Sequence, residues 1–228
     1  MPEFSTSFED AWDRFQALDT LRLAQDGGTL SQGRAQMLVF LIRIEDPAVR
    51  DYAAGIVERL ADIPGIEPYP AEYWHITVKA AGFQVIKRTR EDDVLREEVG
   101  RLGKDAAGVV SALPAYDAQI GLPNGFPDVV CLEIRDHGET RGLNRALASE
   151  IEMLPTYPVD GDTFLPHMSI ARFTSSEGLD QLKAALAELR SEEPGPAFQI
   201  RRVDFIKAWL SEDIPEFETL AGIQLAAS

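Results

Sequence analysis

Residues 74–78 read Trp-His-Ile-Thr-Val, and residues 166–170 read Pro-His-Met-Ser-Ile. Both stretches hold a histidine, an apolar residue, a hydroxyl residue and a second apolar residue, in that order. Each lies in an apolar run that we predict to be a strand, 73–83 in the first case and 164–173 in the second. Side chains alternate between the two faces of a strand. His75 and Thr77 are therefore expected on one face, and His167 and Ser169 on one face of the other strand.

The segments around the two motifs follow the same order of strand, helix, strand, helix and strand. The expected strands are 37–44, 73–83, 115–122, 128–134, 164–173, 198–210 and 217–225, and the expected helices are 47–63, 91–107, 140–153 and 179–189. Pro123-Asn124-Gly125 predicts a turn between two of these strands. This order predicts an α+β fold of two pseudo-twofold-related lobes, each an antiparallel sheet with flanking helices, around a central cleft.

The first 33 residues are predicted to be an N-terminal helical extension to one bilobal domain, 34–228, whose lobes mix both halves of the chain. Phe8, Trp12 and Phe15 recur at helical spacing with charged residues between them. Two interpretations stay open, namely a helix that packs on the domain body and a helix that acts as a lid or binds a partner.

Two imidazoles and two hydroxyls in one cleft suit the cleavage of a phosphoester. A neutral imidazole can accept a proton from the attacking group, and an imidazolium can protonate the leaving oxygen. Hydroxyls can donate hydrogen bonds to phosphate oxygens as negative charge develops on them. Histidine fits both proton transfers because its ordinary pKa is near neutrality.

The paired motifs, together with the longer stretch Phe-Leu-Pro-His-Met-Ser-Ile-Ala-Arg at 164–172, resemble the 2H phosphoesterase superfamily. That resemblance implies the bilobal 2H phosphoesterase-like fold. It implies that His75 and His167 are catalytic, and that Thr77 and Ser169 bind phosphate. It also implies hydrolysis of 2′,3′-cyclic phosphates or 2′-5′ linkages without metal or cofactor, with ligation as a possible reverse reaction. Ser169 stands where many members have threonine.

Two neighbours of the first motif are candidate substrate-binding residues. Tyr73 and Lys79 lie two before and four after His75, so the strand pattern places both on its face. Tyr73 can stack on a base or pack as an ordinary core tyrosine. Lys79 can bind phosphate or extend along the surface to solvent. His137, the remaining histidine, has no hydroxyl residue two positions on and is expected in a solvated loop.

Two other interpretations of the motifs compete with catalysis by paired histidines. A zinc site needs a third protein ligand, and Asp160 and Asp162, which lie near His167, are interpreted as part of a turn. We therefore expect no metal. A non-catalytic module that holds a nucleotide or RNA end is the main alternative, although binding alone would not need a paired acid and base.

The charge of the chain limits its partners. Its 22 Lys and Arg face 38 Asp and Glu, for a formal net charge of −16. Such a surface repels long duplex nucleic acid, whereas a small nucleotide or RNA end can still bind a local pocket. One cysteine, Cys131, in an apolar run indicates a buried thiol and a reducing compartment. With neither a signal peptide nor a membrane helix expected, the sequence predicts a cytoplasmic monomer.

Overall fold

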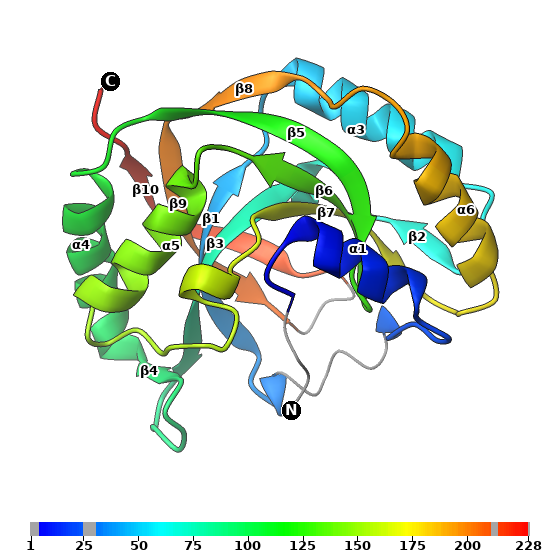
Figure 1. The fold of residues 1–228 in the computed structure, drawn as a ribbon. Helices are drawn as coiled ribbons and strands as arrows, with labels where there is room; N and C mark the ends of the chain where they lie inside the picture. Colours follow the sequence, from blue (N-terminus) through cyan, green and yellow to red (C-terminus); the bar gives the residue numbers. More distant parts are fainter. Residues whose placement is uncertain (1–4, 25–30, 211–213, 228) are drawn as a thin grey trace.

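The computed structural model describes residues 5–24, 31–210 and 214–227, whose order along the chain is shown in Figure 1. The first half contributes α1 (Phe8–Gln16), β1 (Gln36–Arg43), α3 (Pro47–Leu60), β2 (Ile66–Pro68), η2 (Ala71–Tyr73), β3 (His75–Val85), β4 (Asp93–Leu95), η3 (Arg96–Glu98) and α4 (Val99–Val110). The second half contributes β5 (Tyr116–Gly125), β6 (Val129–Arg135), α5 (Glu139–Glu150), η4 (Gly161–Thr163), β7 (His167–Phe173), α6 (Leu179–Leu189), β8 (Ala197–Ile200), β9 (Arg202–Trp209) and β10 (Glu216–Gln224).

The strands form one curled sheet in the order β10-β9-β1-β3-β7-β6-β5-β8, with β4 beside β3 and β2 beside β7. We call β10-β9-β1-β3 the first lobe and β7-β6-β5-β8 the second lobe. All neighbouring strands are antiparallel except β3 and β4, which are parallel. The predicted α+β architecture of two antiparallel lobes with flanking helices is confirmed.

Two helices pack on strands of the lobe to which they do not belong in sequence. α3 follows a strand of the first lobe but packs on β7, whereas α5 follows a strand of the second lobe but packs on β3. In Figure 1, α4 and α5 accordingly lie together at one side of the sheet, and α3 and α6 lie together at the other. Each half of the chain thus covers part of the other, which binds the two lobes into one unit.

The main apolar core lies between the sheet and its helices. Phe40 of β1 stacks on Phe205 of β9 with ring centroids 4.5 Å apart, and both are buried in this core. The opposite face of β1 and β9 carries a smaller apolar cluster that includes Val39, Leu41 and Ile206. We call the first face the helix face and the second the site face. Strand alternation explains the division, because successive residues of β1 enter the two clusters in turn.

The helix α1 packs against β5, which supports the interpretation that it rests on the domain body. Phe15 is buried to 1% exposure, and its ring fills the space that a Cβ would need at Gly125. The side chain of Asn124 donates to the carbonyl of Phe8. Ser7 caps the helix by accepting from the backbone of Asp10.

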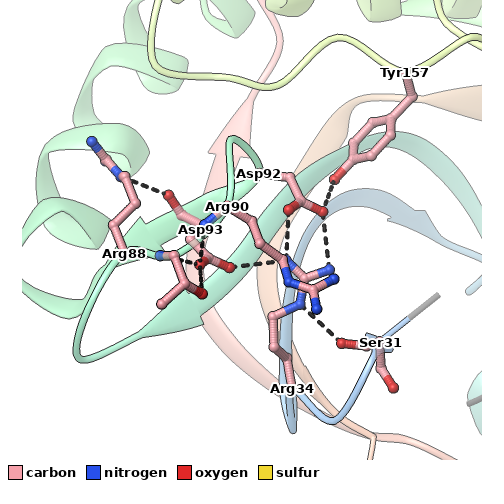
Figure 2. Close-up of polar contacts among 8 residues, drawn as sticks. Ser31, Arg34, Arg88, Arg90, Asp92, Asp93 and Tyr157 are labelled. Atoms are coloured by element: carbon pink, nitrogen blue, oxygen red, sulfur yellow. Dashed lines mark hydrogen bonds and ion pairs between the residues drawn. The ribbon is translucent and has the colours of Figure 1, made fainter. Parts of the chain in front are cut away.

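The helix expected over 91–107 begins later than predicted, at Val99. Figure 2 shows the reason, which is that Asp93 is buried among polar partners. Its carboxylate accepts from the backbone N–H groups of Thr89 and Arg90 and from the guanidinium of Arg34. These bonds hold 93–95 as β4 beside β3, and apolar helical spacing alone did not reveal them.

Two other expectations from the sequence are wrong. The strand expected over 198–210 divides at Arg201, so that β8 pairs with β5 in the second lobe and β9 with β1 in the first. Pro123-Asn124-Gly125 is not a turn, because β5 continues through it after a register shift between Ile120 and Pro123. A bulge accommodates the proline without ending the strand.

Candidate active site

The two motifs meet at the junction of the lobes. β3 and β7 share a single residue pair, Ile76 with Met168, and both side chains are fully buried in the core. His75 and Thr77 flank Ile76 and are partly exposed, as are His167 and Ser169 around Met168. Because residues on either side of a core-facing residue point to the opposite face, all four side chains lie on the site face.

The pairing geometry explains why the four groups converge. In two antiparallel strands, the residue before a matched position on one strand lies opposite the residue after it on the other strand. Continuing the Ile76–Met168 register by one residue each way sets His75 opposite Ser169 and Thr77 opposite His167. The pseudo-twofold axis therefore passes through this pair, with one imidazole and one hydroxyl contributed by each lobe.

Each imidazole is oriented by the same backbone contact. Nδ1 of His75 lies 2.6 Å from the carbonyl oxygen of Tyr73, and Nδ1 of His167 lies 2.8 Å from that of Leu165. A carbonyl oxygen only accepts hydrogen bonds, so Nδ1 is the protonated nitrogen in both rings. Nε2 is then the nitrogen that exchanges a proton with a substrate.

Aromatic side chains surround both imidazoles. The ring of His75 meets Tyr73 and Phe217 edge-on, with centroids 5.1 Å away in each case. The ring of His167 meets Phe126 edge-on at 4.8 Å. This burial disfavours the imidazolium, lowering the pKa of His75 to about 4 and lowering that of His167 as well.

The two histidines have neighbours of opposite charge. The cross-strand partner of His75 is Arg43, whereas that of His167 is Glu133. Burial is the largest effect on both pKa values. The charges of His167 and Arg43 lower the pKa of His75 further, whereas the charge of Asp128 opposes the lowering of the pKa of His167. Glu133 is itself buried and bound by Arg190 at 2.7 Å, by Arg135 and by Asn124. Burial therefore favours the neutral form of both imidazoles, and the neighbouring charges add to this at His75 but oppose it at His167.

The hydroxyls of Thr77 and Ser169 stand beside the imidazoles. Within 5–24, 31–210 and 214–227, no protein group hydrogen-bonds either side chain. Each hydroxyl can therefore donate to an anion bound between the two motifs.

Lys79 does not share the face of His75, contrary to the strand pattern. The register between β1 and β3 shifts after Thr77, so that Leu41 pairs with Thr77 but Phe40 pairs with Lys79. This bulge turns Lys79 to the helix face. There its ammonium lies 2.8 Å from Asp160 and donates to the carbonyl of Pro155, with the side chain fully buried.

Tyr73 lies at the site, although in η2 and not in a strand. Its ring packs between Tyr69 and Phe217, with centroids 4.7 and 4.9 Å away. Its aromatic faces thus contact protein, and its backbone carbonyl holds His75. A direct contact of Tyr73 with substrate stays a prediction.

Three site residues were missed by sequence reasoning, namely Arg43, Phe217 and Phe126. Arg43 is the single charge in the apolar run Met-Leu-Val-Phe-Leu-Ile-Arg-Ile at 37–44, a signal that was readable. Phe217 and Phe126 had no such signal, because only the pairing of distant strands brings them to the histidines.

The model of one protein family, described as the 2′-5′ RNA ligase superfamily, matches residues 49–208. The match spans most of the chain and contains both motifs. The chain belongs to the 2′-5′ RNA ligase superfamily. The resemblance to 2H phosphoesterases predicted from the motifs is thereby confirmed.

Several solved structures share the fold of this chain. The chain superposes on TT0787 of Thermus thermophilus with a TM-score of 0.59 at 15% identity, over 82% of this chain and 97% of that one. It superposes on apo LigT of E. coli with a TM-score of 0.59 at 14% identity, over 85% and 99%. LigT complexed with 3′-AMP matches with a TM-score of 0.59 at 17% identity, over 84% and 99%. No curated protein matches the chain in sequence.

Over residues 5–24, 31–210 and 214–227, no group of three or more His, Cys, Asp or Glu side chains is arranged to hold a metal ion. Within the same ranges, every helix is too short or too polar to cross a membrane.

Proposed function

We propose that this superfamily member is a phosphodiesterase that hydrolyses 2′,3′-cyclic phosphates or 2′-5′ linked phosphoesters of small nucleotides or RNA ends. The observation that carries the proposal is the Ile76–Met168 pair, which sets two matched imidazole–hydroxyl motifs on one face at the lobe junction. The shared Nδ1 contacts support it, because they leave both Nε2 atoms available for proton transfer.

The charges around the two imidazoles favour a different catalytic role for each of them. His75, beside Arg43, is the general base, since its lowered pKa keeps Nε2 free to accept a proton. His167 is the general acid, since burial lowers its pKa but the contact with the Leu165 carbonyl and the charge of Asp128 both favour its charged form. Water attacks phosphorus and passes a proton to His75, while the P–O bond to the ribose oxygen breaks and that oxygen takes a proton from His167.

The hydroxyls of Thr77 and Ser169 stabilise the charge that develops on the non-bridging oxygens. A donor on each side of the phosphate suits the trigonal-bipyramidal arrangement through which an in-line displacement passes. Nothing in this sequence of steps needs a metal ion, because proton transfers and hydrogen bonds supply the catalysis.

The size of the substrate is proposed from relatives and from charge. LigT has been crystallised in complexes with 3′-AMP and with ATP, which are small nucleotides. A formal net charge of −16 disfavours a long polyanion along the surface of this chain. We therefore expect a nucleotide or the end of an RNA strand in the cleft.

The test is a turnover assay in EDTA with the four nucleoside 2′,3′-cyclic monophosphates and with 2′-5′ linked dinucleotides. His75→Ala and His167→Ala are each expected to lower kcat by about 10²- to 10⁴-fold. His137→Ala is the matched control, because His137 is an exposed histidine outside the site. Circular dichroism checks that each variant is folded.

The released isomer, a 2′- or 3′-phosphate, identifies the bond that breaks. Wild-type turnover that survives in either motif variant would refute the paired mechanism. Tight binding of these nucleotides by a folded wild-type protein without turnover would instead support the alternative of a non-catalytic module.

A further inference from the structure

Arg43 is fixed in place on the site face, next to His75. Its Nε donates to Asp204 at 3.0 Å, and its Nη2 donates to the hydroxyl of Thr219 at 3.1 Å. The guanidinium also lies over the ring of Phe217, 5.7 Å from the centroid. Contacts from β9 and β10 therefore hold a side chain that begins on β1.

The negative charge of Asp204 does not fully neutralise the positive charge of Arg43. Asp204, at 4% exposure, also accepts from Nε of Arg202 at 2.6 Å. Two guanidinium groups thus share one carboxylate, and the group of three carries one positive charge in excess. Such an excess is costly in a half-buried place unless an anion offsets it.

The remaining end of the guanidinium is available to that anion. Nη1 of Arg43 has no hydrogen-bond partner among residues 5–24, 31–210 and 214–227, and the side chain is 28% exposed. A guanidinium held by two of its N–H groups presents the others in a fixed direction, which suits bidentate binding of a phosphate.

The order of the strands places Arg43 relative to the two imidazoles. β1 lies on one side of β3 and β7 on the other, so Arg43 and His167 lie on opposite sides of His75. Neighbouring strands are about 4.8 Å apart. The proposed function sets the reacting phosphate between the two imidazoles, whereas the guanidinium of Arg43 extends the other way, toward Asp204 of β9 and Thr219 of β10. The two positions are adjacent but distinct.

We propose that Arg43 forms a subsite for a second phosphate of the substrate, next to the one that is cleaved. This inference rests on the proposed function and narrows its substrate class to nucleotides or RNA ends that carry a phosphate beyond the reacting one. Phe217 forms the apolar wall of the subsite, and Asp204 and Thr219 position the guanidinium.

The experiment compares two substrates that differ by one phosphate, adenosine 2′,3′-cyclic phosphate and its 5′-phosphorylated form. Wild type is expected to favour the phosphorylated form in kcat/KM by about 10- to 100-fold, the effect of a charge-assisted pair. In Arg43→Gln this ratio falls towards one. Arg43→Lys retains part of the preference, because an ammonium keeps the positive charge but cannot bind phosphate through two parallel N–H groups.

Arg59→Gln is the matched control, because Arg59 also pairs with a carboxylate, that of Glu192, but lies on α3, away from the site face. Its ratio is expected to stay at the wild-type value. A wild-type ratio near one, or a ratio that Arg43→Gln leaves unchanged, overturns the subsite while the proposed hydrolysis stands.

Absence of turnover with both substrates would count against the proposed function, and the subsite is then tested by binding. Calorimetry with AMP and adenosine 3′,5′-bisphosphate measures the contribution of the extra phosphate directly. A preference for the bisphosphate that disappears in Arg43→Gln supports the subsite, and equal affinities overturn it.

Discussion

Turnover of a 2′,3′-cyclic nucleotide is expected to be fastest in mildly acid solution, between about pH 4 and a pH below 6.5. The profile of kcat/KM reports the ionisation of the free enzyme. Below pH 4 it falls because His75, whose pKa is lowered to about 4, gains a proton and can no longer act as base. Above the lowered pKa of His167 it falls because the general acid loses its proton.

The size of both effects follows from burial. A pKa of about 4, against an ordinary 6.5, means that protonating His75 costs about 3 kcal/mol more in the protein than in water. Since burial also lowers the pKa of His167, the share of molecules that hold the acid in its charged form is small at pH 8. Turnover at pH 8 should therefore lie well below its value in mildly acid solution.

The assay measures initial rates in EDTA at constant ionic strength from pH 3.5 to 9, with circular dichroism to exclude unfolding at the acid end. Arg43→Gln should move the acid limb to higher pH, because the charge of Arg43 helps to lower the pKa of His75. His137→Ala should move neither limb. An optimum above pH 6.5, or a flat profile with chemistry rate-limiting, would refute the reasoning from buried imidazoles.

Three further predictions concern single side chains. Thr77→Val and Ser169→Ala should each lower kcat by about 10²- to 10³-fold in the same assay, with unchanged melting temperature, because each removes one donor to the developing charge. Lys79→Met should lower the free energy of unfolding by about 3–5 kcal/mol in urea titrations, because it leaves Asp160 buried without its cation; reduced kcat in the folded protein would contradict its place on the helix face. Phe15→Ala should cost about 3–5 kcal/mol by the same titration, since its ring is buried against β5; an unchanged value would show that α1 does not rest on the domain.

Much of the site was predictable because its signal is local. The alternation of histidine, apolar residue and hydroxyl in 75–78 and 167–170 needs only strand geometry to place the imidazole and hydroxyl on one face. The apolar partners Ile76 and Met168 had to face a core, and they do so at full burial. The helix over 179–189 and most strand centres followed from periodicity for the same reason.

The incorrect predictions concern features that are not local, because each feature depends on a contact between segments that are distant in sequence. Lys79 turns to the helix face through a bulge that the pairing with β1 imposes. The late start of α4 depends on Arg34, which lies far from Asp93 in sequence. The division of 198–210 at Arg201 depends on which lobe pairs with each part.

The sequence by itself determined the family, the four motif side chains and the two-lobed α+β plan, because repeated patterns of period two and of helical spacing carry that information locally. Only the tertiary structure decided that Arg43 stands beside His75 and Glu133 beside His167, and that Phe217 and Phe126 border the rings. The physical reason is that strand register is fixed by packing over the whole sheet. A shift of one residue moves a side chain to the other face, and no local pattern records which shift the core prefers.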